Sequence, residues 1–172
     1  MIRLLAAAAA STLLAASALA APAKPTDPQI AHIAYTAGSL DIEAAKQALS
    51  KSHNPDVVAF ANEMVRDHTA VNDKALALVK KLNVTPEANP TSAGLTTQAD
   101  NERATLAKLD GAAFDKAYVA NEVAYHKTVN TALRDTLIPD AQNAELKALL
   151  GTGLKLFEQH QAHAETLAAK LK

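Results

Sequence analysis

The sequence predicts an all-α protein: a bundle of four amphipathic helices, with a short extra helix in the connection between the second and the third. Three observations predict this class. The 172 residues include 40 Ala but only 5 Gly and 6 aromatic residues, a composition that favours helices over sheets. The seven Pro residues fall at or outside the ends of four long runs of the chain. Within these runs apolar residues recur at steps of three and four, and no alternating strand pattern competes.

The first residues have the features of a secretory signal peptide. Arg3 precedes an uncharged stretch, Leu4 to Ala23, which is built mostly from Leu and Ala and contains the small residues of Ser17-Ala18-Leu19-Ala20. A basic start, an apolar middle and an A-x-A end predict a signal peptide over residues 1–20. We therefore expect secretion across the inner membrane and a periplasmic location, with outer-membrane association left open. An uncleaved anchor is the alternative, but the segment is only weakly hydrophobic for a membrane span.

The mature chain is then expected to have a flexible N-terminal segment over residues 21–27 and one bundle domain over residues 28–172. Its first two helices are predicted at residues 28–50 and 55–82. Asp27-Pro28 and Asn54-Pro55 each place a capping side chain before a proline at the first helical position.

The remaining elements follow from the other prolines. Pro86 and Pro90 predict a loop over residues 83–92, followed by a short helix over residues 93–109 that ends at Asp110-Gly111. The next Pro-free run predicts a helix over residues 112–137. Pro139-Asp140 is expected to start the last helix, which runs to residue 171.

Each long helix carries a one-sided apolar stripe, so each needs a partner, and four such helices close into a bundle. The stripes are Ile30, Ile33, Ala37, Leu40, Ala44 and Ala48 on the first helix; Val57, Ala61, Met64, His68, Val71, Ala75, Leu78 and Leu82 on the second; Val119, Val123, His126, Val129, Leu133 and Leu137 on the third; and Leu146, Leu149, Gly153, Phe157, His160, Ala164, Leu167 and Leu171 on the last.

Three of the six His residues, His68, His126 and His160, lie on these stripes and on three different helices. A single buried His is usually neutral and hydrogen-bonded to a carbonyl or carboxylate group. Imidazoles that converge inside a bundle, however, are also how proteins hold transition metals or haem. A divalent transition metal (Fe, Zn, Mn or Cu) is therefore the candidate cofactor.

The position of each His along the bundle predicts which residues meet. His68 and His126 are each about 15 residues from their nearest predicted turns and are expected to face each other. Measured from a turn near Ile138, His126 is about 12 and His160 about 22 residues away, a mismatch of roughly 15 Å. If residues 83–110 cross back along the bundle, His160 instead approaches Glu43 and Glu63. In a simple up-and-down chain it approaches His32.

Other chemistry finds little support in the sequence. The net charge of −1 gives no basic field for nucleic acid, and the absence of Cys excludes disulfides and thiolate metal sites. Glu122 and His126 are four apart, a spacing that we interpret as an ordinary edge contact. Neither this pair nor Glu63 with His68 has the Glu-x-x-His spacing of a di-iron bundle.

Several segments resemble the family known as "domain of unknown function 4142". The most specific is Met64-Val65-Arg66-Asp67-His68-Thr69, within residues 60–69. Residues 114–119, Ile42-Glu43 and Glu158-Gln159-His160 are similar to its other recurring positions. The resemblance implies an exported, ferritin-like helical bundle of bacteria and supplies no reaction. By position it adds Asp67 to the candidate residues, which are then Glu43, Glu63, Asp67, His68, His126 and His160.

The leading hypothesis is a non-catalytic exported bundle that binds a divalent transition metal for storage, sensing or stress protection. The alternative is a structural or interaction module whose buried His residues are satisfied by hydrogen bonds and which forms a homo-oligomer or binds another protein through its Ala-rich helices. A third hypothesis is a redox enzyme with haem b or two metals in the bundle. Neither nucleic acid nor a membrane span after signal cleavage is expected.

Overall fold

The computed structural model describes residues 24–171, and over that range the protein is helical and contains no strand. The all-α prediction is thus confirmed. The signal-peptide prediction for residues 1–20 lies outside the described residues, as do residues 21–23. None of the described helices is sufficiently long and apolar to cross a membrane. The elements are α1 (Asp27–Lys51), α2 (Pro55–Lys81), α3 (Pro90–Leu106), α4 (Gly111–Ala132), the π-helical segment η1 (Leu133–Leu137), α5 (Ile138–Asp140) and α6 (Ala144–Lys170).

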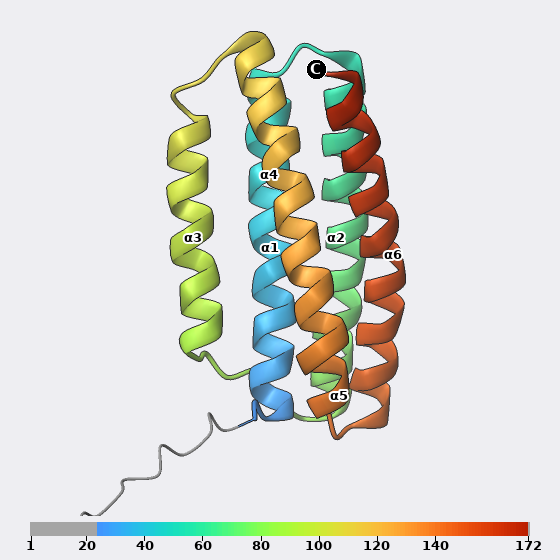
Figure 1. Ribbon diagram of the computed structural model, residues 1–172. Helices are drawn as coiled ribbons and strands as arrows, with labels where there is room; N and C mark the ends of the chain where they lie inside the picture. Colours follow the sequence, from blue (N-terminus) through green and yellow to red (C-terminus); the bar gives the residue numbers. More distant parts are fainter. Residues whose placement is uncertain (1–23, 172) are drawn as a thin grey trace, which may run out of the picture.

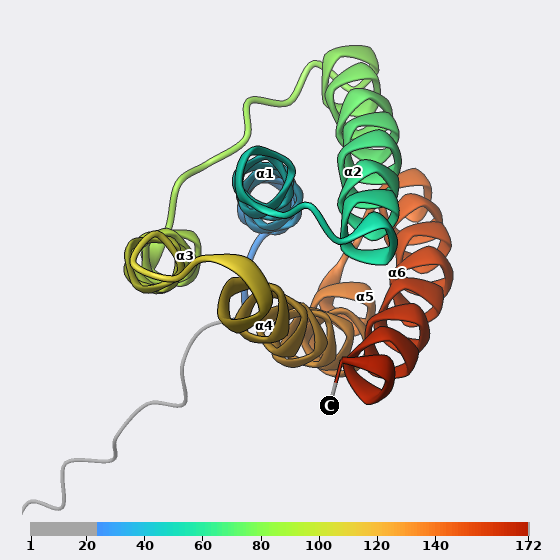
Figure 2. The same ribbon diagram turned by 90° about the horizontal axis from the view of Figure 1, so that it is seen from above.

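Four long helices form the body of the molecule, and α3 lies outside them against α1 and α4 (Figures 1 and 2). Helix α2 runs antiparallel to α1, and α6 runs antiparallel to α4. Between these pairs, α3 carries the chain back along the bundle, so that α4 starts at the end where α2 started. The crossover alternative of the sequence analysis is therefore the observed one.

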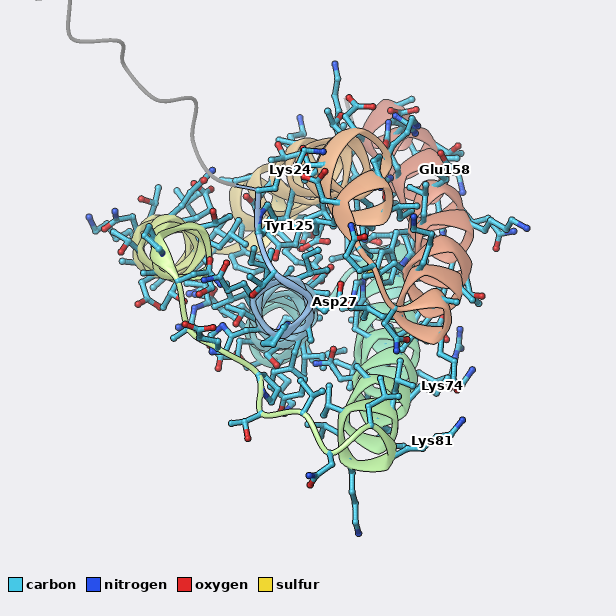
Figure 3. All side chains as sticks on the ribbon, turned by 90° about the horizontal axis from the view of Figure 1, so that it is seen from below. Lys24, Asp27, Lys74, Lys81, Tyr125 and Glu158 are labelled. Carbon is cyan, nitrogen blue, oxygen red and sulfur yellow. The ribbon has the colours of Figure 1, made fainter. Side chains whose placement is uncertain are left out.

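Side-chain caps fix where the helices begin. Asn54 Oδ1 accepts hydrogen bonds from the amides of Asp56 and Val57, at 3.0 and 3.5 Å, and thereby caps α2 as predicted. The cap of α1 is Thr26, one residue before the predicted Asp27. Asp27 instead accepts hydrogen bonds from the amides of Gln142 and Asn143, both at 2.8 Å. Figure 3 shows this end of the bundle, with Asp27 and Lys24.

The last helix begins later than predicted. Pro139 does not start it; the third long helix continues through η1 and α5 to Asp140, and the chain turns at residues 141–143. A proline inside a regular α-helix lacks the amide hydrogen and its ring clashes with the carbonyl group four residues earlier. The wider turn of η1, directly before Pro139, relieves this conflict and lets the helix go on.

The core consists of two apolar clusters with a polar layer between them. One cluster lies toward the end with the α1–α2 turn and includes Phe60, Met64, Phe114 and Tyr118. The other lies toward the opposite end and includes Ile30, Leu133, Leu150 and Phe157. Between the clusters five titratable side chains are buried: Asp41, His68, Glu122, His126 and His160.

Close contact between α1 and α2 depends on Gly38. A Cβ atom at this position would lie 2.5 Å from Oδ1 of Asn72, a buried side chain whose amide donates to Ser39 Oγ at 3.1 Å. Gly151, within α6, has no heavy atom within 4 Å of the corresponding position. The two glycines are therefore a matched pair for substitution: both lie in helices, but an added Cβ atom would be crowded at Gly38 and unobstructed at Gly151.

We expect Gly151→Ala to raise the free energy of unfolding by up to about 1 kcal/mol, because Ala is the better helix former. Gly38→Ala gains the same propensity but displaces Asn72, and we expect a net loss of about 1–2 kcal/mol. Urea denaturation of both variants measures the difference. An equal increase in the free energy of unfolding for both variants would show that α1 and α2 do not approach so closely.

Candidate functional site

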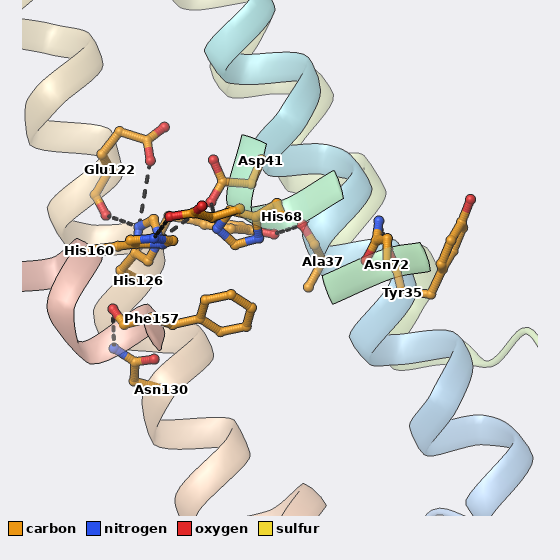
Figure 4. Close-up of polar contacts among 12 residues, drawn as sticks. Tyr35, Ala37, Asp41, His68, Asn72, Glu122, His126, Asn130, Phe157 and His160 are labelled. Atoms are coloured by element: carbon orange, nitrogen blue, oxygen red, sulfur yellow. Dashed lines mark hydrogen bonds and ion pairs between the residues drawn. The ribbon is translucent and has the colours of Figure 1, made fainter. Parts of the chain in front are cut away.

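The site is the polar layer in the middle of the bundle, to which all four long helices contribute (Figure 4). Asp41 comes from α1, His68 from α2, Glu122 and His126 from α4, and His160 from α6. Each of these residues is at most 2% exposed. Their spacing places them on the same faces as the apolar stripes, so that folding of the bundle necessarily buries them.

The three imidazoles meet at one point. The ring centroids of His68 and His126 are 5.6 Å apart, those of His68 and His160 are 5.3 Å apart, and those of His126 and His160 are 5.4 Å apart. One ring nitrogen from each residue lies within 4.8 Å of the other two. Phe157 stacks on His68 at 4.5 Å and closes the cluster on one side.

Two of the rings are oriented by hydrogen bonds through one nitrogen. His126 Nδ1 lies 3.0 Å from the carbonyl oxygen of Glu122, and His160 Nε2 lies 3.1 Å from Asp67 Oδ2. Because a carbonyl or carboxylate oxygen accepts, these nitrogens carry the hydrogens. The opposite nitrogens, His126 Nε2 and His160 Nδ1, are then unprotonated, buried and without a hydrogen-bond partner. Both nitrogens of His68 also lack a hydrogen-bond partner.

Asp41 brings an anion to the same place. Its Oδ2 lies 3.0 Å from His68 Nε2, a contact that becomes an ion pair when His68 is protonated, and 3.4 Å from His126 Nε2. Burial opposes ionisation of the carboxyl group, whereas the neighbouring imidazoles favour it, His68 most strongly, and the net result is a lowered pKa for Asp41. The layer therefore contains a buried carboxylate whose nearest possible donor is the imidazole of His68.

The two oriented imidazoles are neutral at neutral pH. Burial lowers the pKa of His126 to about 4, and the negative charge of Asp41 only partly offsets this shift. Burial also lowers the pKa of His160, with Asp67 opposing the shift. Since the neutral ring is the form that coordinates metals, both residues are already in the ligand state.

Glu122 is the second buried carboxyl group of the layer, and its pKa is shifted in the opposite direction to that of Asp41. Burial, together with the negative charge of Asp41, raises the pKa of Glu122 well above its ordinary value. The same two causes, with Glu122 itself, raise the pKa of Tyr118. The layer thus holds one ionised carboxylate and one carboxyl group that favours the protonated form, 3.5 Å from His126 Nδ1.

An outer layer of charge supports the cluster from the surface. Arg66 makes two hydrogen bonds to Asp67, at 2.7 and 3.0 Å, and so holds the carboxylate that orients His160. Glu63 lies 2.8 Å from His163, a half-exposed residue on the same side of the bundle. Asp67 and Glu63 therefore lie beside the buried cluster, and both can offer an oxygen close to His160.

Two expectations about the candidate residues are wrong. His160 joins His68 and His126, because the turn before α6 is centred near residue 142 and not 138. Counted from there, His126 and His160 are 16 and 18 residues away, a difference of about 3 Å along the axis. Glu43 does not approach His160; it faces the other side of α1 and forms an ion pair with Arg103 of α3. Nor does His160 lie near His32, which pairs with Thr36.

The sequence analysis missed Asp41 and took Glu122 for an edge contact, although both had a detectable signal. Asp41 follows Ala37 by four residues and precedes Ala44 by three, which is the spacing of the buried stripe. Glu122 follows Val119 by three and precedes His126 by four. A charged residue at a stripe position was the available indication that the core there is polar.

The donor atoms match a small transition-metal ion. In a tetrahedral site with bonds of about 2.0–2.1 Å, ligand atoms lie about 3.3 Å apart. The distances from Asp41 Oδ2 to His68 and His126, 3.0 and 3.4 Å, are of this size. His160, whose ring centroid lies 5.3 and 5.4 Å from those of His68 and His126, is the candidate for a third nitrogen ligand.

Fold and site together define a class of protein, an all-helical bundle with imidazole and carboxyl groups buried across its middle. The chain belongs to the family described as "Domain of unknown function (DUF4142)", whose model matches residues 12–167. No curated protein matches the chain. Its fold is similar to a crystal structure described as "putative secreted protein DUF305 from Streptomyces coelicolor", with a TM-score of 0.71 and 11% identity over 83% of this chain and 91% of that one. At this identity the similarity concerns the fold alone.

The raised pKa of Glu122 has a consequence for stability in the metal-free protein. Folding takes up a proton at Glu122 between the ordinary glutamate pKa and the raised one, so this group lowers stability as the pH rises through that interval. We expect Glu122→Gln to become more stable than the wild type as the pH increases above about 4.5, by up to about 1.4 kcal/mol per pH unit. Urea denaturation with a chelator present, from pH 4.5 to 8, measures this difference.

Glu87→Gln is the control, because Glu87 is exposed in the loop between α2 and α3. The depressed pKa of His126 acts in both proteins and largely cancels in the comparison. If the free energy of unfolding changes with pH in the same way for Glu122→Gln and the wild type, Glu122 is ionised in the folded state.

Proposed function

We propose that the protein is an exported metal-binding bundle that holds one divalent transition-metal ion between His68, His126 and His160, with Asp41 as the fourth ligand. The observation that carries the proposal is the orientation of the imidazoles. Each of two rings uses one nitrogen in a hydrogen bond to an oxygen and leaves the other buried without a partner. This is the arrangement of metal-bound histidines, whose second nitrogen is almost always held by a carboxylate or carbonyl group.

Asp41 supports the same conclusion. A buried carboxylate without hydrogen bonds costs several kcal/mol unless a positive charge balances it. A divalent cation between Asp41 and the three rings supplies that charge and satisfies the four nitrogen and oxygen atoms at once. The alternative function, a structural module with satisfied buried histidines, fits this layer less well because its polar atoms lack partners.

The donor set favours some metals over others. Imidazole ligands suit Zn²⁺, Cu²⁺ and Fe²⁺, whereas Mn²⁺ prefers sites richer in carboxylate and water oxygens. A set of three nitrogens and one oxygen from buried side chains suits tetrahedral Zn²⁺ well. Within the range of metals that the sequence suggests, we expect Zn²⁺ or Cu²⁺ to bind more tightly than Mn²⁺.

The signal-like residues 1–20 and the similarity to a structure described as a secreted protein support an exported, periplasmic protein. The chain order of the two helix pairs, joined by a crossover through α3, supports a variant of the ferritin-like bundle. Its ligands differ from those of the di-iron bundles, since imidazoles outnumber carboxylates. Retention of one metal ion, for storage or protection, suits such a closed site.

We expect untagged, metal-free protein to bind one equivalent of Zn²⁺, and free Zn²⁺ at 100 times the dissociation constant to stabilise the fold by about 2.7 kcal/mol. His126→Ala removes a ligand and should abolish this stabilisation. Isothermal titration calorimetry gives the stoichiometry, and urea denaturation with and without Zn²⁺ gives the stabilisation. Since the variant itself loses packing, the increment due to metal is compared, not the absolute stability.

His53→Ala is the matched control, because His53 is exposed in the turn between α1 and α2. It should bind Zn²⁺ like the wild type. If the wild type gains no stability from Zn²⁺, Cu²⁺ or Fe²⁺, the metal function is wrong; if His126→Ala gains as much as the wild type, the metal binds elsewhere.

A further inference from the structure

The half of the bundle with the second apolar cluster contains a large cavity. Its volume is about 730 Å³, and it is lined from α1, α2, the start of α3, α4, η1 and α6. That volume is in the range of sites that bind small organic molecules. The cavity exists because small side chains face it where the helices diverge, among them Ala34, Ala37, Ala75, Ala132 and Gly153.

The cavity is elongated and has polar side chains at both ends, with a buried anionic group at the end formed by Asp41. Along α1 it extends from Gln29 to Asp41, 12 residues or about 18 Å of helix. At the end near Gln29 the lining also includes Lys24 and Asn89. Most of the wall is aliphatic, with Val71, Val79, Leu137 and Leu150 among its members. At the far end lie Asp41, His68 and His126.

This end is built to receive a hydrogen-bond donor. Asp41 and His68 are each 2% exposed; Asp41 Oδ2 lies 3.0 Å from His68 Nε2, while Asp41 Oδ1 and His68 Nδ1 have no hydrogen-bond partner. A purely apolar molecule would leave these atoms without hydrogen bonds, at a cost in binding free energy for each atom. A molecule whose anionic head lay at this end would place its charge against the Asp41 carboxylate.

We propose that the cavity binds an elongated, uncharged lipophile with one hydroxyl group, such as a long-chain alcohol or an alkylphenol, whose hydroxyl donates to Asp41 and whose apolar body lies along α1. The proposal goes beyond metal binding and does not depend on it. The polar end requires only the side chains of Asp41 and His68, and the rest of the affinity comes from apolar contact with the cavity wall.

The test uses metal-free protein in the presence of a chelator and three ligands of one shape: para-pentylphenol, para-pentylanisole and para-pentylbenzoate. The phenol can donate to Asp41, the anisole cannot, and the benzoate carries a negative charge. In calorimetric titrations we expect the phenol to bind at least about tenfold more tightly than either of the others, the effect of one hydrogen bond to a charged group. Equal affinities for the phenol and the anisole, or no binding of the phenol, would overturn the proposal.

Two variants locate the site. Ala75→Phe puts a ring into the cavity and should weaken phenol binding at least about tenfold, whereas Ala77→Phe, at an exposed position on the same helix, should leave it unchanged. If Ala75→Phe binds as tightly as the wild type, the ligand lies elsewhere.

Asp41→Asn keeps the size of the side chain and removes its charge, and thus provides a test that does not depend on filling the cavity. It should reduce the preference for phenol over anisole and strengthen binding of the benzoate. Unchanged preferences would contradict the assignment of the polar end. Because all these titrations exclude metal, a failure here leaves the metal site standing, and a failure to bind Zn²⁺ leaves this result unaffected.

Discussion

The Asp41 carboxylate, buried beside three imidazoles inside a helical bundle, is the constraint on which the rest of the structure depends. A charge in this position is tolerated only when something positive or a donor meets it. Within the layer, His68 is the residue nearest to this carboxylate that can carry an N–H toward it. The hydrogen-bonding nitrogens of His126 and His160 point to oxygens of Glu122 and Asp67, so the faces turned inward are acceptors. The unprotonated nitrogens of His126 and His160 and the carboxylate of Asp41 are acceptors that one cation would satisfy together.

The fold provides this enclosure through the division of its core. On one side of the polar layer, Phe60, Met64, Phe114 and Tyr118 pack tightly and exclude water. On the other side, small residues leave a cavity whose end is the same polar layer. A metal ion and an apolar molecule would therefore meet the protein at adjoining places, both of them at Asp41. Asn72 and Gly38, which draw α1 and α2 together, fix the position of Asp41 relative to His68.

Much of the fold and part of the site could be predicted from the sequence, because helix periodicity and capping are local properties. The stripes placed His68 and His126 inside, and Asn54 marked the start of α2. The junction before α6 could not be predicted in the same way. A proline such as Pro139 usually marks the start or the end of a helix. Here a π-helical turn lets the helix continue past it, and no local sequence signal predicts that turn. That shift of a few residues decides whether His160 meets the other two rings. Asp41 and Glu122 have the spacing of core residues but a polarity that is unusual in a core. Functional sites often depart from simple hydrophobic patterning in this way.

X-ray absorption spectroscopy of the protein loaded with one equivalent of Zn²⁺ tests the central claim most directly, since it reports the ligands of the ion itself. We expect a four-coordinate shell with three imidazole nitrogens and one oxygen at about 2.0–2.1 Å, and the multiple-scattering pattern of the imidazole rings. A shell made of oxygen atoms only, without imidazole scattering, would contradict the assignment of His68, His126 and His160 as the metal site.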